Sequence, residues 1–170
     1  MKVLFGVDVG GTDIKLGAFD WKSQKLLKKW AIKTDLSNEG KQIIPDVAKE
    51  IQSYLCENTL SEADVYGIGM GIPGPVDKDG NVEVCVNLFW NNFNPAEEMR
   101  KFFPHAYIQA GNDANVAALG EFVQGAGRKY KTMMLITLGT GVGGGIILNG
   151  DIVLGASGLA GEIGHIAVGS

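Results

Sequence analysis

Two glycine-rich segments of the sequence carry residue types that bind phosphate. Asp8–Lys15 reads Asp-Val-Gly-Gly-Thr-Asp-Ile-Lys, and Leu138–Gly145 reads Leu-Gly-Thr-Gly-Val-Gly-Gly-Gly. Each segment follows an apolar run and leads into another, so we expect each at the tip of a hairpin. Glycines let main-chain N–H groups close around phosphate oxygens, and the hydroxyls of Thr12 and Thr140 add neutral donors. Either segment alone fits an ordinary glycine hairpin equally well, but the pair, with a carboxylate at Asp8, favours a phosphate clamp.

Two further groups of polar residues could perform chemistry on a substrate. Asn112-Asp113-Ala114-Asn115 is expected to begin a helix, where the helix dipole favours an ionised Asp113 that can accept a proton from a hydroxyl. The same four residues also fit an everyday helix cap. Glu162 and His165 are three residues apart, so one helical turn would place them on one face. A surface helix with an incidental histidine is the alternative interpretation of this pair.

The elements that must position these residues follow an α/β pattern. Strand-like runs at Lys2–Val9, Ile14–Phe19 and Lys25–Lys33 predict a three-stranded meander. A helix is predicted next, with Asn38 or Ser37 as its cap, because apolar residues recur at helical spacing at 43, 44, 47, 51, 54 and 55.

The later elements are shorter. In chain order we expect a buried strand at Asp64–Met70 ending in Gly-Ile-Pro-Gly-Pro, a turn at Asp77–Gly80 before a strand at Val82–Val86, a helix capped by Asn94 with Pro95 at its first position, a strand at Ala106–Gln109, a helix from Asn112 to about Val123, and a second hairpin from Met133–Leu138 and Gly145–Leu148. The segment Gly125–Lys131 is typical of a linker. We therefore predict an N-terminal domain at residues 1–127 and the start of a second domain at 128–170.

Composition excludes several functional classes. The chain has 170 residues, 45% hydrophobic, and a formal net charge of −4, which argues against a surface for nucleic acid. No apolar run reaches the roughly 18 residues of a membrane span, and the N-terminus predicts a strand instead of a signal peptide. Cys56 and Cys85 lie far apart and form no metal-ligand pattern, as expected of reduced thiols. These features predict a cytoplasmic protein without membrane partners.

The motifs together resemble the ROK family of sugar kinases and repressors, and within it the bacterial glucokinases. Besides the two glycine segments, the resemblance rests on Gly-Ile-Pro-Gly-Pro-Val-Asp from Gly71, Asn-Leu-Phe-Trp from Asn87, the segment Gly111–Glu121 and Gly-Glu-Ile-Gly-His from Gly161. It covers the whole chain in the family's order. It implies an actin-like ATPase (ribonuclease H-like) fold, in which a mixed sheet is flanked by helices. Two domains of this kind close over ATP and a sugar, and only the start of the second lies in this chain.

The resemblance also implies roles for individual residues. The phosphate-binding positions are Asp8, Gly10, Gly11, Thr12 and Lys15 in the first motif and Gly139, Thr140, Gly141 and Gly143 in the second. Asp113 matches the catalytic base, and Asp8 is the expected carboxylate for Mg²⁺, held through water. The sugar-facing positions are Gly74, Asn87, Asn112, Asp113, Glu162 and His165. Asp13 departs from the family pattern, and we expect it to point away from the phosphates.

A structural zinc is expected only in a longer chain. His165 matches a histidine that joins three cysteines in the family, and those cysteines, with another sugar-binding glutamate, follow beyond the position of Ser170. Neither Cys56 nor Cys85 can substitute for them. The resemblance further implies a homodimer for the full-length protein.

Three classes of function compete at this stage. An ATP-dependent hexose kinase, most of all a glucokinase with Asp113 as base, accounts for both glycine segments and the sugar-facing residues. Asn87 and Trp90 favour glucose, and a kinase for N-acetylmannosamine, N-acetylglucosamine or fructose is the alternative. A ROK repressor would require a helix-turn-helix ahead of the first strand at Lys2. An ATPase without a small substrate would leave Glu162 and His165 unexplained. The 170-residue chain by itself is expected to be inactive.

Overall fold

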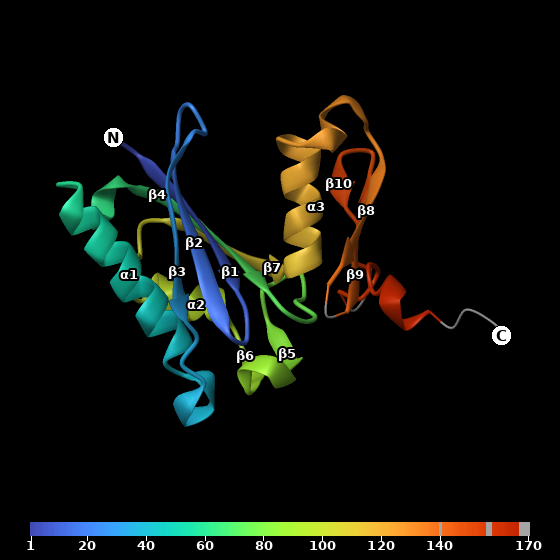
Figure 1. The fold of residues 1–170 in the computed structure, drawn as a ribbon, viewed down its shortest axis with the longest axis horizontal. Coiled ribbons are helices and arrows are strands. Elements are labelled where there is room, and N and C mark those ends of the chain that lie inside the picture. The colour runs from blue at the N-terminus through green and yellow to red at the C-terminus, as the bar shows by residue number, and fades with distance from the viewer. Residues whose placement is uncertain (140, 156–157, 167–170) are drawn as a thin grey trace.

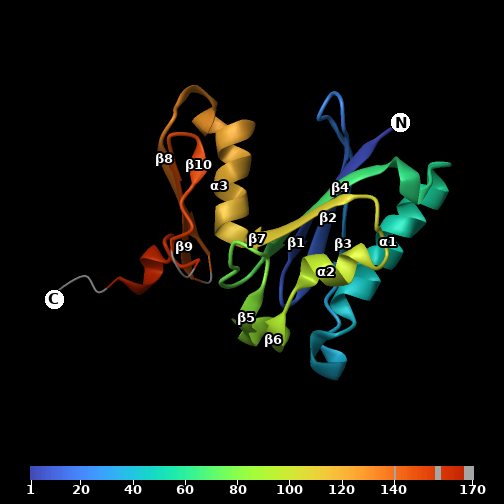
Figure 2. The same ribbon diagram turned by 180° about the vertical axis from the view of Figure 1, so that it is seen from behind.

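The structure is a computed structural model that describes residues 1–139, 141–155 and 158–166. Figures 1 and 2 show two unequal parts, a larger one built on a five-stranded sheet and a smaller one built on a three-stranded sheet. Helix α3 (Asp113–Val123) lies between them and packs against β8 and β9 of the smaller sheet. Thr140, predicted in the second phosphate motif, falls outside the described residues.

The larger sheet is mixed, as predicted. Its strands are β1 (Val3–Val9), β2 (Asp13–Asp20), β3 (Leu26–Lys33), β4 (Val65–Ile72) and β7 (Tyr107–Asn112), in the spatial order β3-β2-β1-β4-β7. The first three form the expected antiparallel meander, while β4 and β7 run parallel to β1. Both parallel strands are longer than predicted, because their pairing continues as far as Ile72 and Asn112.

Helices α1 (Ile43–Glu57) and α2 (Pro95–Arg100) pack on one face of this sheet. The predicted apolar stripe of α1 is buried, and the Tyr54 ring meets Phe5 of β1 edge to face at 5.5 Å. Asn94 caps α2 as expected, since its Oδ1 accepts the N–H of Glu97 at 3.0 Å. These contacts close the main hydrophobic core.

The predicted cap of α1 is wrong. Neither Ser37 nor Asn38 occupies the N-cap position, which is Gln42, and the helix has no side-chain cap. Residues 37–40 form a 3₁₀ segment in which Asn38 and Glu39 adopt left-handed φ angles of 52° and 59°. Gly40 is tied down there, because the indole Nε1 of Trp90 donates to its carbonyl at 3.1 Å. A long-range contact thus moves the start of the helix beyond the residues that look like caps.

A small hairpin, only half of which was predicted, follows the turn at 77–80. Strand β5 (Val82–Cys85) pairs with β6 (Trp90–Phe93), a strand absent from the predicted elements. Trp90 is buried in the core, and the burial of its ring fixes which face of β6 points inward. Between the two strands, Phe89 adopts a left-handed φ of 57°.

The smaller sheet contains the second predicted hairpin. Its strands are β8 (Met133–Leu138), β9 (Val142–Leu148) and the two-residue β10 (Asp151–Ile152), in the order β10-β9-β8. Strand β9 begins at Val142 instead of the predicted Gly145, because its glycines pack against α3 as strand residues. A Cβ at Gly145 would lie 2.4 Å from Ala118 Cβ, closer than real contacts allow.

The outer strands of the two sheets differ in their side chains. On β3, at the edge of the larger sheet, Lys28 pairs with Glu57 at 2.9 Å and Lys33 with Asp13 at 2.7 Å. On β8, exposed residues alternate with half-buried ones, and the exposed residues Met134, Ile136 and Leu138 are large and apolar. The predicted domain boundary at residue 127 falls in a 3₁₀ segment, Ala126–Lys129, and stays a prediction.

No helix within the described residues has the length and apolar character needed to cross a membrane.

Candidate active site

A pocket of about 370 Å³ lies where the two sheets and α3 meet. Its walls come from β1, β4, β8 and the first turns of α3, and they are Val7, Asp8, Gly71, Asp113, Ala114, Val116, Ala117 and Thr137. The pocket therefore brings together two carboxylates that are far apart in the sequence, Asp8 and Asp113.

The register of the larger sheet explains how these carboxylates meet. Asp8, Gly71 and Gly111 stand side by side on β1, β4 and β7, on the face away from α1. Helix α3 packs directly over these glycines, and a Cβ at Gly71 would make an ordinary contact of 3.5 Å with Asp113 Cα. A Cβ at Gly111 would lie 3.3 Å from Val116 Cγ2. Because glycines at 71 and 111 place no side chain on this face, the start of α3 lies close to Asp8.

Asp113 is the first residue of α3, as its predicted role requires. One carboxylate oxygen accepts the N–H of Ala114 at 2.7 Å. Although part of the residue is exposed, neighbouring protein groups displace water from the carboxylate, and this raises its pKa. The Ala114 N–H acts in the opposite direction, and the negative charge of Asp8 raises the pKa further. A carboxylate with a raised pKa is a stronger base than an ordinary aspartate.

Asp8 is paired with Lys15 across the β1–β2 ladder. Their charged groups are 3.1 Å apart, and both side chains are more than half exposed. An exposed pair of this kind contributes little to stability, so the pair can exchange partners readily. An exposed carboxylate oxygen beside a phosphate turn is suited to hold a hydrated Mg²⁺ through water, because Mg²⁺ gives up its water ligands reluctantly.

The first glycine turn, between β1 and β2, is held by the end of β3. Thr34 Oγ1 donates to the Gly10 carbonyl at 2.6 Å, and the Thr34 N–H donates to the Thr12 carbonyl at 3.0 Å. The Gly10 N–H closes the turn on the Asp13 carbonyl at 3.1 Å. The Asp13 carboxylate lies against Lys33 of β3. This turn is therefore shaped by its own sheet, and the anchoring residue Thr34 had no signal in the sequence.

Asn87 lies next to this first turn. A Cβ at Gly11 would come within 3.3 Å of the Asn87 carbonyl oxygen, so the two backbones touch. Trp90, in contrast, is buried in the core. Asn87, in the loop between β5 and β6, thus lies against the first glycine turn.

Gly74 and Asn112 are joined directly. The Asn112 Nδ2 donates to the Gly74 carbonyl at 3.0 Å, and its Oδ1 accepts the N–H of Asn115 at 3.1 Å. Asn112 is therefore the cap of α3 and the support of the Gly74 turn at the same time. Gly74 has a φ of +146°, which favours glycine. One donor and one lone pair of the amide remain for a ligand.

The second glycine turn is described only at Gly139 and Gly141. The Gly139 N–H donates to the Gly141 carbonyl at 2.9 Å, and a Cβ at either glycine would meet no atom within 4 Å. Gly143, predicted in the phosphate motif, lies within β9 opposite Thr137. Thr137 lines the pocket but was not among the predicted residues. Its signal was a single hydroxyl in the apolar run of β8.

Glu162 comes directly before a 3₁₀ turn, Ile163–His165, where one helical turn was predicted. The segment packs along β9, since a Cβ at Gly144 would lie 2.6 Å from the Gly161 carbonyl oxygen. The side chain of His165 falls outside the described part of the chain. Whether Glu162 and His165 share a ligand therefore stays a prediction.

Zinc has no described site. The described residues contain no group of three histidine, cysteine or carboxylate side chains that could hold a metal ion. Cys56 is exposed on α1 and Cys85 is buried on β5, and both are free thiols. The described residues thus do not fit a structural zinc by themselves.

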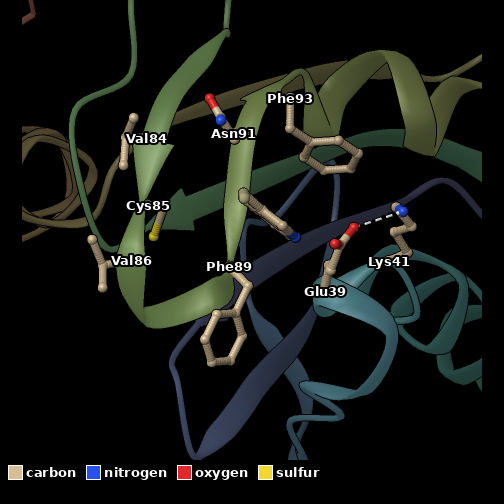
Figure 3. A pocket seen from close by; sticks show the side chains of 9 residues that line it. Glu39, Lys41, Val84, Cys85, Val86, Phe89, Asn91 and Phe93 are labelled. Carbon is tan, nitrogen blue, oxygen red and sulfur yellow. Dashed lines mark hydrogen bonds and ion pairs between the residues drawn. The ribbon is translucent and has the colours of Figure 1, made fainter.

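A second pocket, of about 520 Å³, opens between the β5–β6 hairpin and residues 39–41 (Figure 3). Apolar side chains such as Val84, Val86 and Phe89 surround it, and Glu39 pairs with Lys41 at 2.8 Å. None of the predicted site residues lines it. Of the two pockets, the smaller one contains the predicted site residues Asp8 and Asp113.

A mixed sheet whose first hairpin turn is rich in glycine, beside a helix that starts with a carboxylate, defines this chain as part of an actin-like ATPase fold. The sequence model of the ROK family matches residues 4–170, so the chain belongs to the ROK family. Both the predicted fold class and the predicted family are confirmed.

Individual relatives share this match at moderate identity. The chain is 44% identical over 164 residues to a glucokinase of Halalkalibacterium halodurans, covering 96% of this chain and 49% of that protein. It is 34% identical over 164 residues to an N-acetyl-D-glucosamine kinase of Yersinia pseudotuberculosis, covering 95% and 51%. A ROK family glucokinase from Streptomyces griseus, solved with glucose and AMPPNP, has a TM-score of 0.81 and 32% identity, covering 98% and 51%. The chain thus spans about half the length of the relatives it matches.

Proposed function

We propose that the protein to which this chain belongs phosphorylates a hexose with ATP, and that glucose is its substrate. The observation that carries the proposal is the pocket in which Asp113, at the start of α3, faces the same space as Asp8 beside the first glycine turn. Relatives named as glucokinases and N-acetyl-D-glucosamine kinases support the reaction class. The identity of 44% with a glucokinase, against 34% with an N-acetyl-D-glucosamine kinase, supports glucose within that class.

In the proposed mechanism, Asp113 orients the attacking sugar hydroxyl and takes its proton. Phosphoryl transfer passes through a loose transition state, so the proton leaves late and the base mainly positions the oxygen. The raised pKa of Asp113 makes its carboxylate a better acceptor at that moment. Asn112, whose amide is already fixed by Gly74 and Asn115, supplies a rigid donor for a neighbouring hydroxyl. Gly74 permits close approach of the sugar.

The phosphates of ATP are proposed to lie over the first glycine turn. The N–H groups of Gly11 and Thr12 and the Lys15 ammonium supply positive charge there, while Gly10, whose N–H bonds the Asp13 carbonyl, shapes the turn. The second turn, Gly139–Gly141, is proposed to lie on the opposite side of the phosphates, with Gly143 behind it. Mg²⁺, held through water by Asp8, would neutralise phosphate charge when bound. Glu162 and His165 remain the proposed sugar ligands of the second domain, with zinc at His165 only in a full-length chain.

The compartment and assembly are part of the proposal. Two free thiols suit a reducing cytoplasm, and the full-length protein is proposed to be a homodimer.

The decisive experiment follows ADP formation from ATP and glucose by the full-length protein. Asp113→Asn is expected to lower turnover by at least about a hundredfold and to leave glucose binding within severalfold, as the loss of a positioned base requires. The control is Glu57→Gln, which changes a carboxylate at the C-terminal end of α1 and is expected to keep normal turnover. Near-normal turnover of the Asp113 variant would remove this residue from the mechanism, and a protein that never consumes ATP with any hexose would refute the proposal.

A further inference from the structure

The Pro73–Gly74 turn has few hydrogen bonds of its own. Pro73 and Pro75 carry no N–H group, so the turn lacks two backbone hydrogen-bond donors. Among the described residues, no backbone hydrogen bond outside the sheet ladders involves residues 73–76. Within the described part of the chain, the hydrogen bonds to this turn come from side chains.

Two side chains hold it through consecutive carbonyls. The thiol Sγ of Cys85 donates to the Pro73 carbonyl at 2.9 Å, and the Asn112 Nδ2 donates to the Gly74 carbonyl at 3.0 Å. The donors come from different elements, the last residue of β5 and the cap of α3. Cys85 and Asn112 are 3% and 7% exposed, so both donor residues are largely shielded from water.

Cys85 sits on a rigid support. It pairs with Trp90 in the β5–β6 ladder, and Trp90 is in turn fixed to the Gly40 carbonyl. Figure 3 shows the Cys85 side chain on the side of the strand opposite Val84 and Val86. Its sulfur also closes the space beside Gly74, because a Cβ at that glycine would lie 3.8 Å from Sγ. Neither the motifs nor the comparisons assign this residue a role.

We infer that Cys85 is a positioning residue of the sugar site, which rests on the proposed function: its thiol and the Asn112 amide clamp the Pro73–Gly74 turn, so that the turn and the start of α3 keep a fixed relation to each other. Because Asp113 follows Asn112, the clamp also fixes the base relative to the backbone at Gly74. Burial raises the pKa of the Cys85 thiol, and the charge of Asp113 raises it further, so the S–H donor is retained at neutral pH.

The clamp can be tested without any activity. Native alkylation of the two cysteines, read by peptide mass mapping, gives Cys56 as a fast internal reference and Cys85 as a slow reporter of the turn. Asn112→Ala removes the other half of the clamp and is expected to speed Cys85 labelling about fivefold, since one neutral hydrogen bond is lost. The matched control is Asn94→Ala, which removes the cap of α2 and leaves the Cys85 rate within about twofold. Equal Cys85 rates in the Asn112 variant and the parent chain would overturn the clamp.

The effect on the sugar is read from kinetics of the full-length protein. Cys85→Val removes the donor and is expected to raise the KM for glucose about three- to tenfold, with the KM for ATP unchanged. Cys85→Ser keeps a donor and should recover most of the loss, while Cys56→Ser changes nothing. An unchanged glucose KM in Cys85→Val, or equal impairment of the Ser and Val variants, would overturn the positioning role. A parent protein that turns over ATP with no hexose would instead refute the proposed function, which the labelling result does not depend on.

Discussion

The two glycine turns look alike in sequence but are built differently. The first, at Gly10–Thr12, is bound at two carbonyls by Thr34 and packs against Asn87, within a five-stranded sheet. The second, at 139–141, shows among the described residues one internal backbone bond, and its two described glycines face open space. The first turn is therefore shaped by the part of the chain that carries it. For the second turn, the described residues show no comparable support from the neighbouring strands.

The glycines just after the second turn serve packing. Gly143, Gly144 and Gly145 lie in β9, and a Cβ would collide with Thr137 of β8 at Gly143, with the Gly161 segment at Gly144 and with α3 at Gly145. One glycine-rich segment, in which Thr140 and Val142 separate the glycines of the turn from those of β9, thus serves two structural purposes. The variants below separate the two, beginning with the one of largest expected effect.

Gly145→Val is expected to destabilise the chain by about 3 kcal/mol, because the added Cβ would lie 2.4 Å from Ala118 Cβ and 2.8 Å from the Ala114 carbonyl oxygen. Neither contact can relax unless α3 moves away from β9. Urea unfolding followed by circular dichroism measures the change. A loss below about 1 kcal/mol would show that α3 is not packed on β9 as described.

Gly10→Ala and Gly141→Ala compare the two turns directly. A Cβ at Gly10 would lie 2.7 Å from the Asp13 carbonyl oxygen, and we expect a loss of about 2 kcal/mol. A Cβ at Gly141 meets no neighbour within 4 Å, so its variant should stay within about 0.5 kcal/mol of the parent chain. The same urea measurement applies. Equal losses at both positions would contradict the contrast between the turns.

Thr34→Val removes the hydroxyl that holds the Gly10 carbonyl and should cost about 1 kcal/mol. Thr132→Val is the matched control in the second hairpin, where the hydroxyl accepts the Asn149 N–H at 3.3 Å in an exposed position. Its expected cost is below about 0.5 kcal/mol. Thermal unfolding of both variants measures the two losses, and a loss at Thr34 no larger than that at Thr132 would contradict the anchoring of the first turn by Thr34.

Asp113→Asn is expected to raise stability slightly at neutral pH. The folded-state pKa of Asp113 is raised, so its contribution to stability is fully present below the unfolded carboxyl pKa and is lost as the pH rises through the folded pKa. An amide at this position does not titrate, so the gain of the variant should appear above that pKa and vanish in acid. Melting temperatures of the variant and its parent, measured from acid to neutral pH, test the sign of this difference in stability. A variant that is less stable than its parent at neutral pH would contradict it.

The sequence predicted those features that depend on local pattern. Alternation in β1–β3, the helical stripe of α1 and the Asn94-Pro95 start of α2 all follow from neighbouring residues. The fold class and the family followed from motifs that are contiguous in the chain. In the candidate site, the start of α3 at Asp113 was predicted from its capping sequence.

The remaining features depend on contacts between distant residues. The start of α1 was wrong because Trp90 holds Gly40 across 50 positions, and β6 was missed because the burial of Trp90 was not visible locally. The start of β9 was wrong because a glycine run does not reveal whether a helix covers it. The support of the Gly74 turn by Cys85 joins two segments whose residue types carry no capping or catalytic signal.

The lysines of β3 have a consequence for behaviour at high protein concentration. An outer strand offers unpaired backbone groups to which a strand of another molecule can add. Lys28, Lys29 and Lys33 line this edge, and Lys28 and Lys33 are already paired with Glu57 and Asp13. Two copies meeting there would bring like charges together and break both pairs. The edge is thereby protected against the strand addition that leads to fibrils, even though its backbone is available.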